Sequence, residues 1–218
     1  MSDAVRDTIL KSAAVLGEMA GPLAAPTARA ADLMVETLRG GHRIYVCGNG
    51  GSASQAQHIA GELVGRFLFN RPALPCVALA SDAAVLTAIA NDYSVDQLFE
   101  RQVEALVREG DLLWALSTSG SSPNVLRAAA KARELGAKVV GMTGRTGGKM
   151  KDLCDVLLCV PADTSPLIQE GHLVLLHVLC AIVERSLFGG QGSDAFSGRM
   201  EKGSDPVSGS GGPREASA

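Results

Sequence analysis

The feature that most constrains this chain is an alternation of short apolar segments with segments of helical pattern. Such an alternation predicts an α/β fold in which a five-stranded parallel sheet lies between layers of helices, with additional helices at the N-terminus. Aromatic residues make up only 4% of the sequence, so Leu, Val, Ile and Ala must fill the core, as in buried parallel sheets. The expected strands are 43–47, 75–79, 111–117, 138–143 and 156–160. The expected helices are 4–20, 27–38, 53–66, 82–90, 95–108, 123–135, a short one near 149–154, and 166–187.

The 218 residues fit one domain with some chain left over. We place this domain at residues 1–188 and find no internal repeat. From Gly189 the sequence is rich in Gly, Ser and charged residues and has few apolar ones. A segment of that composition cannot bury enough surface to order itself, so a flexible tail is expected over residues 189–218.

Charge and cysteine content narrow the class of protein. The formal net charge is −3 and no block of Lys and Arg stands out, which argues against nucleic-acid binding. The five cysteines form no C-x-x-C pair, which favours a reducing compartment, and four lie in apolar runs where burial is expected. The N-terminus has no long apolar stretch, so neither a signal peptide nor a membrane span is expected. The cytoplasm is therefore the predicted location. The cysteines are Cys47, Cys76, Cys154, Cys159 and Cys180.

A glycine-rich segment, 48–52, follows the first expected strand and precedes a helix. Glycines let a ligand approach the backbone amides, and the helix N-terminus favours an anion. Alone, the segment fits an ordinary tight turn as well as a phosphate site. A dinucleotide site is disfavoured because Ala53 stands where the third glycine of the fingerprint belongs, and Asp82 lies too far along the chain.

A second segment, 117–122, follows the third expected strand with five hydroxyl side chains in six positions. Pro123 then opens the next helix, as proline commonly does at a first helical position. A plain turn rarely needs so many hydroxyls, so we interpret this segment as a set of neutral donors for a phosphate. Ligands of open parallel sheets bind at the carboxyl ends of the strands, where both segments lie.

Four side chains suited to proton transfer or metal binding lie on two of the expected helices. His58 and Glu62 are four residues apart and share a face, while Gln169 and His177 are separated by about two turns. Taken singly, His58 and Glu62 fit an ordinary pair on a helix surface, and His177 fits a histidine buried in the core. Taken together, they could serve as acid and base in an aldose–ketose isomerisation, or hold a divalent metal such as zinc. The sequence leaves both roles open.

Five motifs follow one another along the chain: CGNGGSASQAQHIAGELVGRF, AIANDY, STSGSSPNV, TGRTGGKM and IQEGHLVLLH. In this order they resemble the phosphoheptose isomerase (sedoheptulose-7-phosphate isomerase) family of SIS-domain proteins. The resemblance implies a single SIS domain of flavodoxin-like topology. It also implies conversion of D-sedoheptulose 7-phosphate to D-glycero-D-manno-heptose 7-phosphate in nucleotide-activated heptose biosynthesis. A homotetramer with shared active sites, and bound Zn²⁺, are further implied.

Matching motif to motif assigns roles to individual residues. Glu62 and His177 would be the acid–base pair. The metal ligands would be His58, Glu62, Gln169 and His177, so the two roles overlap. The substrate-binding residues would be Asn49, Gly50, Gly51, Ser52, Arg66, Asn91, Asp92, Ser117, Thr118, Ser119, Ser122 and Gln169. One departure concerns the sugar: an acidic residue is common in the family where Pro166 stands here, with Asp163 nearby, so the exact sugar phosphate stays open.

A non-catalytic tetramer of the SIS group, which binds the bacterial replication initiator protein, is the competing interpretation. Segments 85–92 and 179–188 resemble that protein as much as the isomerase. By its family pattern it lacks the catalytic glutamate and the final histidine. Glu62 and His177 are both present here, which favours the enzyme. A sugar-phosphate-sensing regulator would carry a DNA-binding helix-turn-helix, for which no room is expected.

Overall fold

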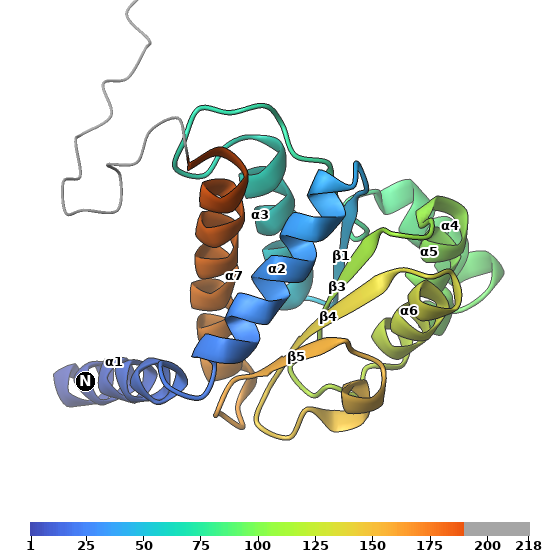
Figure 1. The fold of residues 1–218 in the computed structure, drawn as a ribbon. Coiled ribbons are helices and arrows are strands. Elements are labelled where there is room, and N and C mark those ends of the chain that lie inside the picture. Colours follow the sequence, from blue (N-terminus) through green and yellow to red (C-terminus); the bar gives the residue numbers. More distant parts are fainter. Residues whose placement is uncertain (190–218) are drawn as a thin grey trace, which may run out of the picture.

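A computed structural model describes residues 1–189, so the expected tail, apart from Gly189, lies outside the described residues. Its centre is a five-stranded sheet in the order β2-β1-β3-β4-β5, and every strand pairing is parallel. This confirms the predicted fold class, the α/β sandwich visible in Figure 1. The strands are β1 (Ile44–Gly48), β2 (Cys76–Ala78), β3 (Leu112–Leu116), β4 (Lys138–Thr143) and β5 (Val156–Cys159).

Helices cover both faces of the sheet (Figure 1). α2, α3 and α7 lie on one face and α5 and α6 on the other, while α1 projects from the edge of the domain. The helices are α1 (Ser2–Met19), α2 (Ala24–Arg39), α3 (Gly51–Val64), α4 (Ala83–Asp92), α5 (Glu100–Leu106), α6 (Pro123–Glu134) and α7 (Ser165–Phe188).

Two predicted helices differ from the structure. The helix expected at 95–108 is divided into a 3-10 turn, Val95–Gln97, and the shorter α5. The division falls beside Phe99, a residue that is 2% exposed and packs in the core. The helix expected near 149–154 is a 3-10 turn at Gly148–Asp152, because the left-handed backbone of Gly147 starts a tight turn there.

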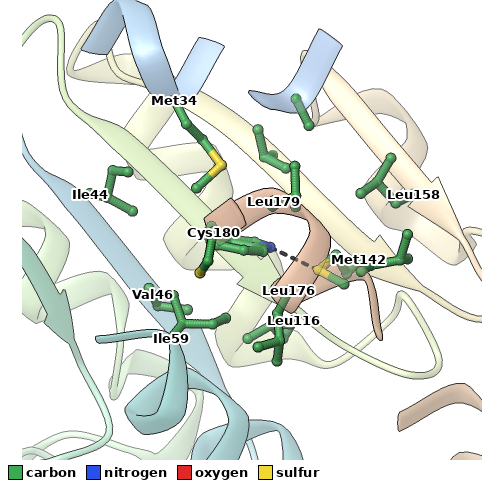
Figure 2. Close-up of a cluster of buried hydrophobic side chains, with 14 of the residues drawn as sticks. Met34, Ile44, Val46, Ile59, Leu116, Met142, Leu158, Leu176, Leu179 and Cys180 are labelled. Carbon is green, nitrogen blue, oxygen red and sulfur yellow. Dashed lines mark hydrogen bonds between the residues drawn. The ribbon is translucent and has the colours of Figure 1, made fainter. Parts of the chain in front are cut away.

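The sheet separates two apolar cores. Successive residues of β1 point to opposite faces, so Ile44 enters the core under α2, α3 and α7, and Tyr45 enters the other. Figure 2 shows the first core, where the Trp114 indole N–H lies 2.9 Å from the Met142 sulfur. Because both faces of every inner strand are buried, the strands read as unbroken apolar runs. The expectation of buried cysteines is confirmed for Cys47, Cys76 and Cys180, whereas Cys154 and Cys159 are half-buried.

α7 is the longest helix of the described residues. By length and composition it could span a membrane, with a mean hydropathy of 1.6, and 44% of that apolar window is buried inside the domain. One side packs on α2 and α3, as the core helix of an α/β domain does. The opposite side leaves Leu173, Val174 and Val178 exposed.

The strand order places the functional loops. β1 and β3 are neighbours in the sheet although β2 lies between them in the chain. The order of connection therefore reverses between β1 and β3, and the loops that leave their carboxyl ends diverge from a common edge. Such a switch point is where open α/β sheets bind ligands. The two loops are 48–52 and 117–122, the segments singled out in the sequence.

Candidate active site

The first loop, 48–52, turns β1 directly into α3. Gly50 has a φ of +53°, a conformation that side chains rarely adopt. A Cβ on Gly48 would come within 2.8 Å of the Ser52 Cβ, so the turn requires glycine here as well. Ser52 is buried, while Asn49 and Gly50 are exposed. The loop thus presents backbone, rather than bulky side chains, at the N-terminus of α3.

The second loop, 117–122, gathers hydroxyl groups. The Ser117 Oγ lies 3.0 Å from the Ser122 Oγ and 3.5 Å from the Ser119 Oγ. Gly120 has a φ of +62°, and a Cβ there would overlap the Gly147 carbonyl, so the turn cannot carry a side chain. No side chain caps the N-terminus of α6 at Ser122, although the Val125 and Leu126 amides already bond the Ser122 carbonyl. Loops 48–52 and 117–122 are called the cradle below.

Asn124 joins the two halves of the cradle. Its side-chain amide exchanges two hydrogen bonds of 2.8 Å with that of Asn49, and Asn124 is 4% exposed. The sequence analysis missed this residue, although it stands in the STSGSSPNV motif. Because the pair bridges two loops 75 residues apart in the chain, it fixes their separation, which a phosphate held by both would require.

Gln169 lies at the cradle. A Cβ on Gly51 would meet the Gln169 side-chain nitrogen at 2.6 Å, so the carboxamide lies against the start of α3. The Gln55 side chain donates to the Gln169 carbonyl at 2.7 Å, and the Thr118 and Ser165 hydroxyls are 3.2 Å apart. The predicted substrate contact of Gln169 would therefore be made at the cradle. His177 lies eight residues further along α7, about 12 Å along the helix axis.

His58, Glu62 and His177, called the trio below, form a cluster on α3 and α7. The His58 Nε2 lies 2.9 Å from the Glu62 Oε1 and 3.4 Å from the His177 Nε2. The potential ligand atoms all lie within 4.8 Å of one another. The Phe67 ring stacks on His177 with centroids 5.5 Å apart. The structure therefore unites three of the four residues that the sequence grouped, with Gln169 standing apart.

The trio suits either role predicted for it. Zn–N and Zn–O bonds of about 2.0–2.1 Å in a tetrahedral site put neighbouring ligand atoms about 3.3 Å apart. Two of the separations within the trio, 2.9 and 3.4 Å, bracket that value, so the donors fit a divalent ion. Both contacts of His58 are made by the same ring nitrogen, Nε2, so His58 can share a proton with Glu62 or with His177, and Glu and His side chains are suited to acid–base work near neutral pH. The trio is partly open to solvent, with the His58 side chain 40% and the Glu62 side chain 23% exposed.

The remaining predicted residues lie elsewhere. Arg66 is exposed in the loop after α3, next to Phe67 and hence to the trio. The Asn91 amide donates to the Asp92 carboxylate at 2.8 Å at the end of α4. Within residues 1–189, Asn91 and Asp92 make no hydrogen bond to the cradle or the trio. Asp92 instead lines a cavity of about 570 Å³ together with Tyr93 and Arg101.

Two further features of α7 bear on the predictions. Pro166 lies in the first turn of α7, and nearby Asp163 is turned to Arg145, with 3.4 Å between charged atoms. His172 is fully buried and in contact with the Thr143 carbonyl at 3.2 Å. Burial lowers the pKa of His172 to about 4, so this imidazole stays neutral near pH 7. It belongs to the core rather than to the trio.

Comparison with known proteins agrees with the fold and the motifs. The SIS domain family matches residues 9–144. The phosphoheptose isomerase of Burkholderia pseudomallei (strain K96243) is 53% identical over 169 residues, which are 78% of this chain and 86% of that protein. Solved phosphoheptose isomerases from Neisseria gonorrhoeae and Francisella tularensis superimpose with TM-scores of 0.80 and 0.81, at 41% and 39% identity. These matches cover 84% of this chain and 98% and 97% of the two structures.

Proposed function

Because this chain belongs to the phosphoheptose isomerase family of SIS-domain proteins and is thus a sugar-phosphate isomerase of heptose biosynthesis, we propose that it interconverts D-sedoheptulose 7-phosphate and D-glycero-D-manno-heptose 7-phosphate. The observation that carries the proposal is the convergence of Glu62 and His177 with His58. These residues come from helices more than a hundred positions apart in the chain. Acid–base catalysis requires these side chains to lie close together in space.

The cradle is the proposed phosphate site. It combines the hydroxyls of residues 117–122 with the N-terminal ends of α3 and α6, whose dipoles favour an anion. The Asn49–Asn124 pair holds the loops at a fixed spacing. Because a phosphate is bound alike before and during the reaction, these contacts serve affinity and orientation rather than the proton transfers themselves.

The trio is the proposed site of proton transfer. Glu62 takes the proton from C1 of the ketose, and the electron pair forms the C1–C2 double bond of an enediolate. The carbonyl oxygen on C2 gains a proton from the trio, and the hydroxyl on C1 loses one to it. When the pair returns to C2, Glu62 delivers its proton there and C1 becomes the aldehyde carbon. His177 carries the proton between the two oxygens, and His58 lies between His177 and Glu62, with its Nε2 2.9 Å from the Glu62 carboxylate.

A divalent metal, zinc by its ligand set, is proposed at the same residues. His58, Glu62 and His177 would hold it, whereas Gln169, about 12 Å along α7 from His177, would reach it only from another copy of the chain. When bound, such an ion would polarise the oxygens of the substrate. Protein purified without chelators is expected to contain about one zinc per chain by elemental analysis, and folded His58→Ala is expected to contain far less. Metal-free protein with full activity in chelator would leave the trio as acid–base groups only.

We also propose a homotetramer whose active sites are shared between copies. Ser52 of the cradle and Glu62 of the trio are about 15 Å apart along α3. A substrate held by the cradle of one chain would therefore react at the trio of another copy. Exposed apolar side chains lie within four residues of Glu62 or His177 in the chain, and a patch of such side chains is a mark of an interface. These are Val64, Leu173, Val174 and Val178. Light scattering at micromolar concentration is expected to give about four times the 22.5 kDa of one chain, and a monomer mass would reject the proposal.

The direct test is incubation of purified protein with sedoheptulose 7-phosphate, followed by detection of an aldoheptose phosphate. The same sugar without its phosphate is the control, and it should be a far poorer substrate because the cradle has nothing to hold. An inactive protein that binds the replication initiator protein would favour the non-catalytic alternative. The proposed place of the reaction is the cytoplasm.

A further inference from the structure

Arg71 and Glu184 form a buried ion pair outside the residues considered so far. The Arg71 Nε lies 2.8 Å from the Glu184 Oε1, and their side chains are 1% and 0% exposed. Burying two charges is costly unless every remaining donor and acceptor is satisfied. The further partners of this pair therefore show what it holds in place.

Glu184 holds the loop that follows α3. One carboxylate oxygen accepts the backbone N–H of Phe67 at 3.0 Å. The other accepts those of Leu68 and Phe69 at 2.6 and 3.1 Å. Three consecutive amides thus converge on one carboxylate from α7. Such charge-assisted hydrogen bonds are about twice as strong as neutral ones, so this loop is fixed rather than free to adjust.

Arg71 holds the end of α3 itself. Its guanidinium donates to the carbonyl of Glu62 at 2.8 Å and to that of Leu63 at 2.8 Å. The last carbonyls of a helix have no partner within the helix and need one from outside. One end of the Arg71–Glu184 pair therefore fixes the backbone of the proposed base, Glu62, while the other fixes the loop that carries Phe67.

Of the two anchored residues, Glu62 belongs to the trio and Phe67 contacts it. The Glu62 carboxylate contacts His58, and the Phe67 ring is nearly parallel to the His177 imidazole, with 16° between the planes. We propose that Arg71 and Glu184 are positioning residues for isomerisation, which hold Glu62 and His177 at their working separation. This inference rests on the proposed function, and neither residue touches the reacting atoms.

Two variants test the pair from either side. Arg71→Lys keeps the charge but cannot bond Glu184 and the α3 carbonyls together, because an ammonium lacks the planar fork of a guanidinium. Glu184→Gln replaces one carboxylate oxygen with an NH₂ group, which cannot accept hydrogen bonds from Arg71 or from the backbone N–H groups of the loop. Each is expected to lower kcat about tenfold to a hundredfold, since displacements near 1 Å can cost that much. KM should change by less than about threefold, because the cradle lies at the other end of α3.

Hydrogen–deuterium exchange supplies a readout besides activity. Peptides covering residues 65–71 should exchange faster in both variants, while peptides from the sheet keep wild-type protection. Val103→Ala is the matched control: Val103 is fully buried on α5, in the core across the sheet. It should lower the melting temperature yet leave kcat and the 65–71 exchange unchanged.

The inference is overturned if folded Arg71→Lys and Glu184→Gln keep wild-type kcat, or if Val103→Ala loses as much activity at an equal loss of melting temperature. Should Glu184→Gln fail to fold, Arg71→Lys alone decides. A wild-type protein that does not isomerise sedoheptulose 7-phosphate would refute the proposed function instead. The exchange of residues 65–71 then still reports whether the pair holds this loop.

Discussion

Replacing Glu62 with Gln is expected to lower the turnover of sedoheptulose 7-phosphate by at least about a hundredfold, within the range of a general base. Glutamine keeps the size of the side chain and can still bond His58, but it cannot take a proton from carbon. The backbone of residue 62 would still be held by Arg71, so the fold should persist. Steady-state kinetics and a melting curve on the same preparation are the measurements.

Ser119→Ala is the matched comparison for Glu62→Gln. Ser119 is exposed in the cradle, and its hydroxyl accepts a hydrogen bond from the Ser121 backbone N–H and lies 3.5 Å from the Ser117 hydroxyl. Loss of a phosphate contact weakens binding of the substrate equally in the ground state and the transition state. KM should therefore rise while kcat changes little. Near wild-type turnover by Glu62→Gln would show that the proton is removed by another group.

The fold was predictable because its determinants are local. The inner strands are apolar runs of five or six residues, apart from Lys138 and Thr143 at the ends of β4, and most helices between strands have a clear pattern. The sequence could not give the interruption beside Phe99, which depends on that ring reaching the core between α5 and the sheet. A buried aromatic within a helical pattern looks the same whether the helix continues or breaks.

The candidate site was predictable only in parts. The cradle loops follow strands directly, so strand assignment alone put them at one edge. The two members of the trio on α3 were visible as a four-residue spacing, but their meeting with His177 required knowing that α3 and α7 run side by side. Arg71 and Glu184 gave no signal, since a lone arginine and a lone glutamate 113 residues apart are typical of an exposed surface.

Gln169 and Asp92 illustrate the limit of assignment by motif. The resemblance implies a metal contact for Gln169 and a sugar contact for Asp92. In one chain, however, Gln169 lies at the cradle and Asp92 lines the cavity beside α4. A motif match carries residue identity but not the distances within a single subunit, and those roles would need groups from another copy.

His177→Ala is expected to lower isomerisation by at least about a hundredfold as well, but through a different step. Alanine removes the proton carrier between the two substrate oxygens while leaving Glu62 and His58 in contact at 2.9 Å. Proton removal from C1 should therefore be impaired less than the complete reaction. In deuterated water, His177→Ala should still exchange the C1 proton of the ketose faster than it forms aldose, whereas Glu62→Gln should lose both.

Phe67→Leu is the control for the loss of the ring stacked on His177. It removes the aromatic contact but keeps the imidazole, the Phe67 backbone amide bonded to Glu184, and an apolar side chain. A smaller loss of turnover than in His177→Ala is expected, because the proton carrier remains. If exchange at C1 and isomerisation fall by the same factor in His177→Ala, His177 acts at or before proton abstraction. If neither falls, the trio is not the catalytic centre, since a group that moves protons between the oxygens cannot be removed without slowing the product-forming step.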